Sequence, residues 1–180
     1  YSSGTTKNSF SVGGVDDADE IANMTTRLSA ANGTLILQSP YVEGVTFTPG
    51  DIITTGGGDD SRDGVEVVRG TDPSTMEGFF YEIPQSVAKK IKDLACEEIG
   101  VYLINEYGQI GGIADDNENA TVFYPIPIAQ RTFNLADKGF GGKTGRDGNA
   151  VRWQFKPNWS DEFYIVTPTD YNPLDKLATS

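Results

Sequence analysis

The stretch AVRWQFKPNWSDEFYIVT, residues 150–167, decides the fold class more clearly than any other part of the chain. Apolar and polar side chains alternate over 150–156, which is the period of a half-buried β-strand. Residues 162–167 form a second short run, rich in the aromatic and β-branched residues that favour strands. Pro157 and Asn158 lie between the two runs and are residue types that favour turns. The stretch therefore predicts two β-strands joined by a short connection.

Short runs of this kind, rich in apolar residues and bounded by turn-favouring residues, recur over most of the chain, and those at 41–48 and 65–69 also alternate. They predict further strands at 34–38, 41–48, 51–55, 65–69, 79–83, 101–104, 109–113 and within 120–133. Pro49 and Gly50 predict a turn after the second of these, and residues 56–64 predict a loop. Apolar side chains recur at helical spacing clearly at about 85–98, which predicts one main helix. The spacing is weaker within 15–32, where Ile21, Met24 and Leu28 would share one face of a short helix. We therefore expect a mainly β (α+β) fold, either an antiparallel β-sandwich or a barrel, with one flanking helix.

The length and the distribution of small residues predict one domain with extensions. A chain of 180 residues suits a single core. We expect a flexible or partner-bound N-terminal arm at 1–14, the β-rich domain at 15–167, and an extended C-terminal tail at 168–180. Residues 134–149 form a long glycine-rich loop, which we expect to reach a neighbouring subunit because long loops in compact domains tend to be functional.

The charge of the chain disfavours two classes of partner. Its 26 acidic and 14 basic residues give a net charge of −12, so it lacks the cationic footprint of a nucleic-acid-binding protein. The same charge disfavours an anionic membrane surface. No apolar run approaches the length of a transmembrane helix, and no signal peptide is visible. We expect neither specific nucleic-acid binding nor membrane association.

The residue inventory excludes the common kinds of active site. The chain has no histidine, and Cys96 is its only cysteine, so neither a Ser-His-Asp nor a Cys-His site can form within one chain. Paired carboxylates such as Asp115 and Asp116 leave glycoside hydrolysis as the least favoured alternative. We predict that the protein is not an enzyme.

One loop carries part of a metal-binding pattern. Asp59, Ser61 and Asp63 place oxygen ligands at alternate positions before Gly64, as in the first half of a calcium loop. Gly70 occupies the position at which a glutamate would complete the ligand shell. We predict no cofactor, with calcium at these three residues as the alternative.

Two stretches carry a resemblance to a class of proteins. Residues 153–174, WQFKPNWSDEFYIVTPTDYNPL, and residues 81–113, YEIPQSVAKKIKDLACEEIGVYLINEYGQIGGI, resemble virion structural proteins of tailed phages that infect Bacteroidetes-type hosts. Tail tube subunits are similar in size and layout, with a β-barrel or sandwich, a flanking helix, and loops and arms that join rings. The resemblance implies a non-enzymatic structural subunit of a repeating virion assembly, a phage tail tube protein, which assembles in the host cytoplasm with copies of itself and with other virion proteins.

The two leading functional hypotheses select different surface residues. An assembly subunit would use side chains of the glycine-rich loop and the tail at its interfaces: Phe140, Lys143, Arg146, Tyr171 and Leu174. The alternative is a carbohydrate-binding β-sandwich module, with or without calcium, in which exposed Trp153 or Trp159 stacks on sugars. Of the two interpretations of the aromatic residues in the last hairpin, we favour the one in which they fill the core. The first predicts self-association, and the second predicts a monomer with an aromatic platform.

Overall fold

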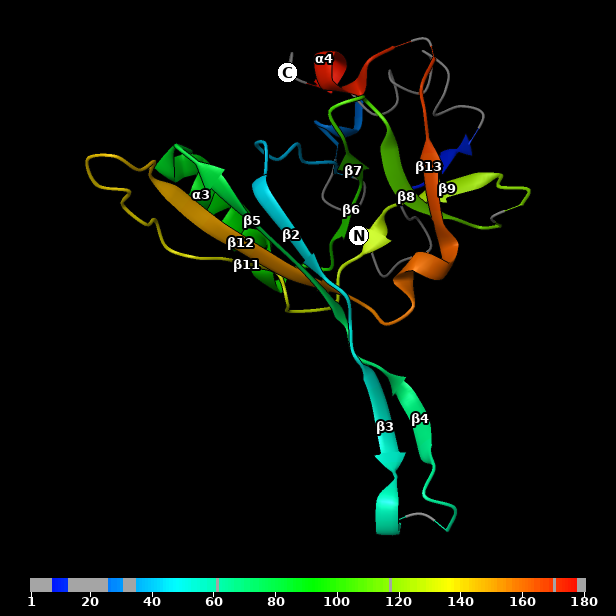
Figure 1. Ribbon diagram of the computed structural model, residues 1–180. Helices are drawn as coiled ribbons and strands as arrows, with labels where there is room; N and C mark the ends of the chain where they lie inside the picture. Colours follow the sequence, from blue (N-terminus) through cyan, green and yellow to red (C-terminus); the bar gives the residue numbers. More distant parts are fainter. Residues whose placement is uncertain are drawn as a thin grey trace.

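The structure is a computed structural model that describes residues 8–12, 26–30, 35–60, 62–116, 118–169 and 171–177. Figure 1 shows a β-rich body with one main helix and a long two-stranded arm that points away from it. The body is a sandwich of antiparallel sheets, and the sheets within the described residues do not close into a barrel. The predicted α+β class is therefore confirmed, in its sandwich form.

The two longest strands lie at the centre of a four-stranded sheet. Its order is β11 (Asn134–Leu135), β12 (Gly148–Phe155), β5 (Ser74–Tyr81) and β2 (Glu43–Thr48). Strand β12 pairs with β5 along its whole length, and Trp153 lies opposite Met76. Buried and more exposed residues alternate along β12, as the sequence predicts, because one face of this sheet packs on the core.

The second sheet lies across the core from the first. Its order is β1 (Phe10–Ser11), β9 (Val122–Tyr124), β8 (Ile110–Ala114) and β13 (Phe163–Val166), and β7 (Leu103–Ile104) also pairs with β8. A separate short pair joins β6 (Gly100–Val101) to β10 (Ile126–Pro127). The stretch within 120–133, predicted as one long or broken strand, is thus broken at Pro125, which has no N–H group to continue a ladder.

Two apolar clusters hold these layers together. The first lies between the sheets and under helix α3 (Gln85–Asp93), which ends in a 3₁₀ turn, η2 (Leu94–Cys96). Its buried members are Phe80, Ile83, Ile126, Ile128, Leu135, Val151, Trp153 and Phe155. The second cluster covers the opposite face of β8 and consists of buried Phe10, Ile110, Phe123 and Val166. The second sheet is therefore buried on both faces.

Glycine in β8 makes this double burial sterically feasible. A Cβ atom at Gly112 would lie 2.6 Å from the ring of Phe123 and 2.6 Å from the carbonyl oxygen of Tyr124. Contacts that short are excluded by van der Waals repulsion, so no larger residue fits without a shift of the strand. The absence of a side chain at this position lets the Phe123 ring lie flat against the sheet.

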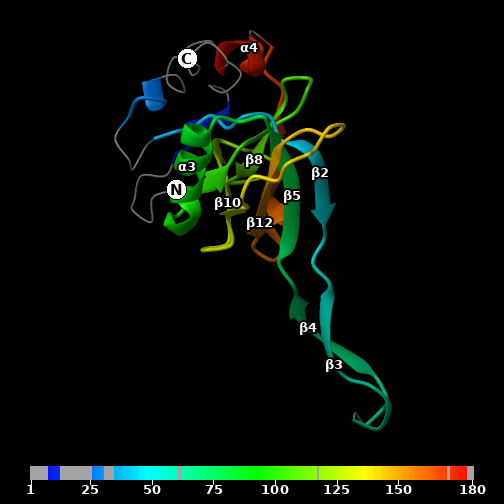
Figure 2. The same ribbon diagram turned by 90° about the vertical axis from the view of Figure 1, so that its left-hand side faces the viewer.

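The arm is formed by β3 (Ile52–Gly56) and β4 (Glu66–Thr71), with a 3₁₀ turn, η1 (Gly58–Asp60), near its tip. Figures 1 and 2 show that β3 continues the direction of β2 and that β4 leads back into β5. The predicted turn at Pro49 and Gly50 is therefore wrong. The chain runs through these residues into the arm, and the reversal of direction occurs in the predicted loop at 56–64.

Other expectations from the sequence are corrected at the edges of the domain. Residues 35–38 form no strand. Of the expected N-terminal arm, residues 8–12 belong to the domain, because β1 pairs with β9 and Phe10 is buried; residues 1–7, 13 and 14 lie outside the described residues. The tail contains a short helix, α4 (Pro173–Leu177), instead of remaining extended, and a further 3₁₀ turn, η3 (Trp159–Glu162), precedes β13.

Candidate interaction surfaces

Both faces of the arm expose branched apolar side chains. Ile53 and Val67 lie on the face that also carries Thr55, while Ile52 and Val68 lie on the other face, as the strand pairing requires. Together with Val65, these side chains are between 45% and 65% exposed. A two-stranded hairpin is marginally stable by itself in water, and none of these side chains belongs to or packs against the apolar clusters of the body among the described residues. The arm is therefore a surface whose apolar area remains available for a partner.

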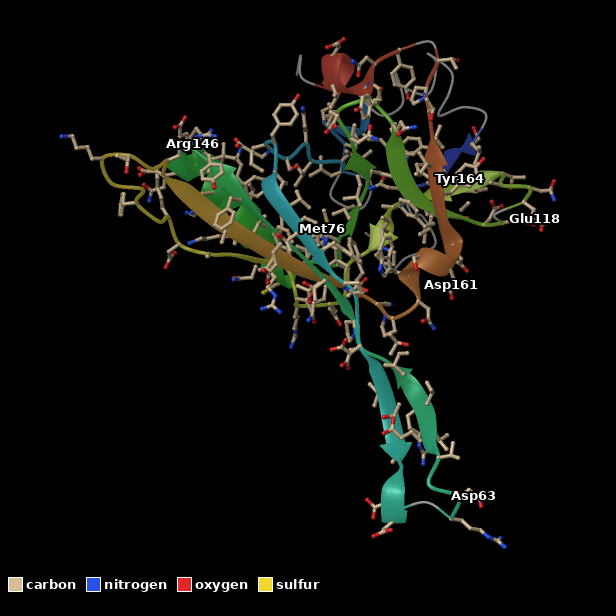
Figure 3. All side chains as sticks on the ribbon, viewed as in Figure 1. Asp63, Met76, Glu118, Arg146, Asp161 and Tyr164 are labelled. Carbon is tan, nitrogen blue, oxygen red and sulfur yellow. The ribbon has the colours of Figure 1, made fainter. Side chains whose placement is uncertain are left out.

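The tip of the arm is acidic. Residues 58–66 carry four carboxylates, of Asp59, Asp60, Asp63 and Glu66, and one cation, Arg62. All five residues are exposed. Figure 3 places Asp63 at the far end of the arm, away from the rest of the molecule.

The predicted calcium ligands lie in this tip. Asp59 belongs to η1 and Asp63 to the following turn, while Ser61 lies outside the described residues. Among the residues that the structure describes, no group of three or more Asp, Glu, Cys or His side chains is arranged to hold a metal ion. Calcium binding at this loop stays a prediction from the sequence.

A narrow neck joins the arm to the sheet. The amide of Asp72 donates a 2.8 Å hydrogen bond to the carbonyl of Asp51, and the amide of Gly50 donates to the Ser74 hydroxyl at 3.3 Å. A Cβ atom at Gly50 would lie only 1.7 Å from the carbonyl oxygen of Asp72. The two segments of the chain that form the neck therefore approach each other so closely that only glycine fits at position 50.

The opposite end of the four-stranded sheet carries aromatic and basic side chains. The ring of Phe79 stacks on Tyr81 with 5.8 Å between centroids, and the guanidinium of Arg146 lies 4.5 Å from the centre of the Tyr81 ring. Arg146 also donates to both carboxylate oxygens of Glu43, at 2.9 and 3.0 Å, and lies 3.6 Å from Glu82. Figure 3 shows Arg146 and Asp63 at opposite ends of the molecule.

The glycine-rich loop forms the outer part of this end. It is shorter than the predicted 134–149, because 134–135 belong to β11 and 148–149 to β12. Its base is closed by reciprocal backbone hydrogen bonds between Gly139 and Gly148, at 2.8 and 3.1 Å. Inside the base, the Asp147 carboxylate accepts the Gly141 amide at 3.1 Å. These bonds give the loop a definite shape and leave Phe140, next to its base, 82% exposed.

Charge is compensated within the loop at every position except one. Asp137 forms an ion pair with Lys92, which lowers the pKa of the carboxyl through a hydrogen bond and charge attraction. Lys138 lies 3.7 Å from Asp147, and Arg146 is held by Glu43. Lys143 is exposed and makes no ion pair within the part of the chain that the structure describes. It is the cation of this loop that remains for a partner.

The predicted interface residues thus fall in two places. Phe140, Lys143 and Arg146 come together at the outer end of the sheet. Tyr171 and Leu174 lie far from them in the tail, half-buried, where Asn172 packs against the β7–β8 turn at Gly108. An interface role for the tail stays a prediction.

The tryptophans proposed as a sugar platform lie in the apolar interior. Trp153 is 5% exposed and belongs to the first core cluster. Trp159 is half-buried, with its ring 4.7 Å from that of Phe155 and 5.5 Å from that of Phe163. A sugar needs an open ring face, and Trp153 does not offer one. The favoured interpretation, that Trp153 fills the core, is therefore confirmed, and the alternative of Trp153 as an exposed platform is wrong.

The arm itself is the feature that sequence reasoning missed. A signal for it is present in the sequence: apolar, β-branched runs lie on both sides of GGGDDSRDG (56–64) at similar distances, and Pro49 and Pro73 interrupt them on the two sides. Interpreted together, these runs describe one long hairpin with an interrupted ladder. Interpreted singly, each proline appears to end a separate strand.

Comparisons with protein-family models, with curated proteins and with solved structures find no match to this chain. In the described residues, no helix has both the length and the apolar character needed to cross a membrane.

Proposed function

We propose that the protein is a non-enzymatic structural subunit of a repeating assembly, of the tail tube kind found in phage particles, and that its arm contacts a neighbouring copy. The single observation that carries this proposal is the arm, with apolar side chains exposed on both faces and outside both core clusters of the described body. Exposed apolar surface of this extent commonly marks a site of protein association. The resemblance to tail tube subunits, which join rings through arms and loops, supports the same conclusion.

The edges of the arm also favour association. Among the strands that the structure describes, β3 and β4 pair only with each other, so each leaves one row of backbone N–H and C=O groups without a strand partner there. Such open edges are templates for pairing with another chain, and proteins usually shorten or cover them. A long open hairpin is therefore easier to explain in a subunit whose partners cover it than in an independent monomer.

Removal of the arm tests this proposal. Because Asp51 and Asp72 already face each other across the neck, residues 52–71 can be replaced by Asn-Gly, a dipeptide that closes tight hairpins. We expect the shortened chain to keep its fold, because the arm contributes no member of either core cluster, and to remain a monomer. The wild-type chain should form rings, tubes or filaments in negative-stain microscopy.

The control is the thermal unfolding of both chains, followed by circular dichroism. Similar unfolding temperatures together with loss of assembly would support the proposal. A shortened chain that folds and assembles as well as the wild type would show that the arm is not the contact.

A further inference from the structure

The two ends of the four-stranded sheet differ in chemistry. One end leads through the neck to the arm, which combines exposed Ile and Val side chains with an acidic tip. The other end combines aromatic rings with exposed cations. We call this second surface the aromatic–basic end, and it consists of Phe79, Tyr81, Phe140, Lys143 and Arg146.

We propose that the arm of one copy docks on the aromatic–basic end of the next copy, so that the copies join end to end. This inference rests on the proposed function and names the surface that receives the arm. The occupant of the aromatic–basic end is therefore a second copy of this chain.

Charge complementarity supports this pairing. The protein carries a net charge of −12, so two copies repel each other over most of their surfaces. The acidic tip, with Asp59, Asp60 and Asp63, needs a partner surface that offers cations. Lys143 offers one without a competing carboxylate among the described residues, and opposite charges across an interface fix its orientation and register.

The apolar parts of the two surfaces also correspond. Phe79 is 43% exposed and Phe140 is 82% exposed, although both are large apolar side chains. Stacked aromatic rings and an arginine are the side chains most often enriched at the centres of protein interfaces. The branched side chains of the arm would cover these rings, while its acidic tip would reach the loop.

The positions of the two surfaces determine the kind of assembly. They lie at opposite ends of the molecule, as Asp63 and Arg146 show in Figure 3, so one copy can use both at the same time. A contact between two different surfaces is heterologous, and it continues from copy to copy unless the geometry closes it into a ring. The expected product is thus a stack, ring or filament, and not a symmetric dimer.

A complementation experiment tests the inference directly. The arm-deleted chain keeps the receiving end and lacks the arm. The double variant Phe140→Ala/Lys143→Glu keeps the arm and lacks two exposed contacts of the receiving end. Arg146 is left unchanged because Glu43 and Glu82 hold it within its own chain.

We expect each variant alone to sediment as a monomer, because each lacks one half of the contact. An equimolar mixture should sediment as a complex of one copy of each, because one arm and one receiving end remain and the chain of contacts stops there. The control Lys156→Glu makes the same charge change at the other end of β12, and it should assemble like the wild type.

The possible results separate the two proposals. If Phe140→Ala/Lys143→Glu assembles as fully as the wild type, the receiving surface is wrong while the assembly function stands. If the mixture of the two variants stays monomeric although the wild type assembles, the end-to-end contact is likewise overturned. If the wild type itself is monomeric, the proposed function fails first.

Discussion

The carboxylate of Asp115 organises the turn between β8 and β9. It accepts the backbone amides of Thr121 and Val122, both at 2.9 Å, and the hydroxyl of Thr121. These bonds favour the charged form and lower the pKa of Asp115 from about 3.8 to about 2, with the Thr121 hydroxyl as the largest cause. From the sequence, Asp115 is considered only as one of a pair of carboxylates, whereas its bonds in the structure connect the ends of the two strands.

Substitution of this residue has a pH-dependent consequence. Because the folded pKa is depressed, the carboxylate stabilises the fold above its ordinary pKa of about 3.8, and this contribution is lost as the pH falls through about 2. We expect Asp115→Asn to lower the unfolding temperature at neutral pH, and the difference from the wild type to shrink over that acidic range.

Thermal unfolding by circular dichroism at several pH values measures this difference. Glu106→Gln is the matched control, since Glu106 is exposed and its carboxylate accepts no hydrogen bond within the described residues. An equal effect of both substitutions would indicate that only net charge matters, contrary to the structure.

At the scale of elements, the neck determines how the arm leaves the sheet. Thr48 and Thr75 form the last ladder pair of β2 and β5, and Ile52 and Thr71 form the first pair of the arm. Between them, Pro49 and Pro73 supply no N–H groups, so the ladder is interrupted. The hydrogen bond from the Asp72 amide to the Asp51 carbonyl still joins the two segments of the chain there, next to the close approach of Gly50 to Asp72.

Glycine substitutions in and beyond the neck test this interpretation. We expect Gly50→Ala to lower the free energy of unfolding by at least about 1 kcal/mol, because a Cβ atom there would overlap the Asp72 carbonyl and force the backbone apart. Gly70→Ala, in the arm itself, meets no atom within 4 Å and should change it by less than about 0.5 kcal/mol. Chemical denaturation of both variants gives the comparison, and similar losses would show that the neck is not tightly packed.

The elements also show where prediction from sequence succeeds. Strand β12 and helix α3 follow from local periodicity, because each packs one face on the core and thus has the pattern of its own type. The region 34–38 resembles a strand in composition but forms none at 35–38, because pairing depends on distant partners that local pattern does not reveal. The arm was missed for the opposite reason: its exposed apolar side chains have no core to explain them within one chain.

The candidate surfaces were predicted in part. Phe140, Lys143 and Arg146 were selected from the glycine-rich loop, and the structure brings them together with Phe79 and Tyr81 from a strand far away in sequence. No periodic pattern could link these residues, because the contact depends on the pairing of β5 with β12. The aromatic residues of the last hairpin had two interpretations, and the structure places Trp153 in the core.

At the scale of the whole molecule, the body and the arm have different roles. The body buries both faces of one sheet and one face of the other, so its stability needs no partner. The arm extends beyond this core with its apolar side chains exposed. A body with its own core and an extension whose apolar side chains remain exposed is the organisation expected of a subunit that folds first and assembles afterwards.

The apolar character of the arm is therefore the central feature of the account. The variant Ile52→Thr/Ile53→Thr/Val67→Thr/Val68→Thr removes it while keeping β-branched residues that favour strands. The matched control, Ile165→Thr, changes an exposed isoleucine of β13 in the same way.

Sedimentation velocity of the wild type, the fourfold variant and the control at high protein concentration is the most direct measurement. We predict assemblies larger than a dimer for the wild type and the control, and a folded monomer for the fourfold variant. A wild-type chain that stays monomeric, or a fourfold variant that assembles equally well, would contradict the account.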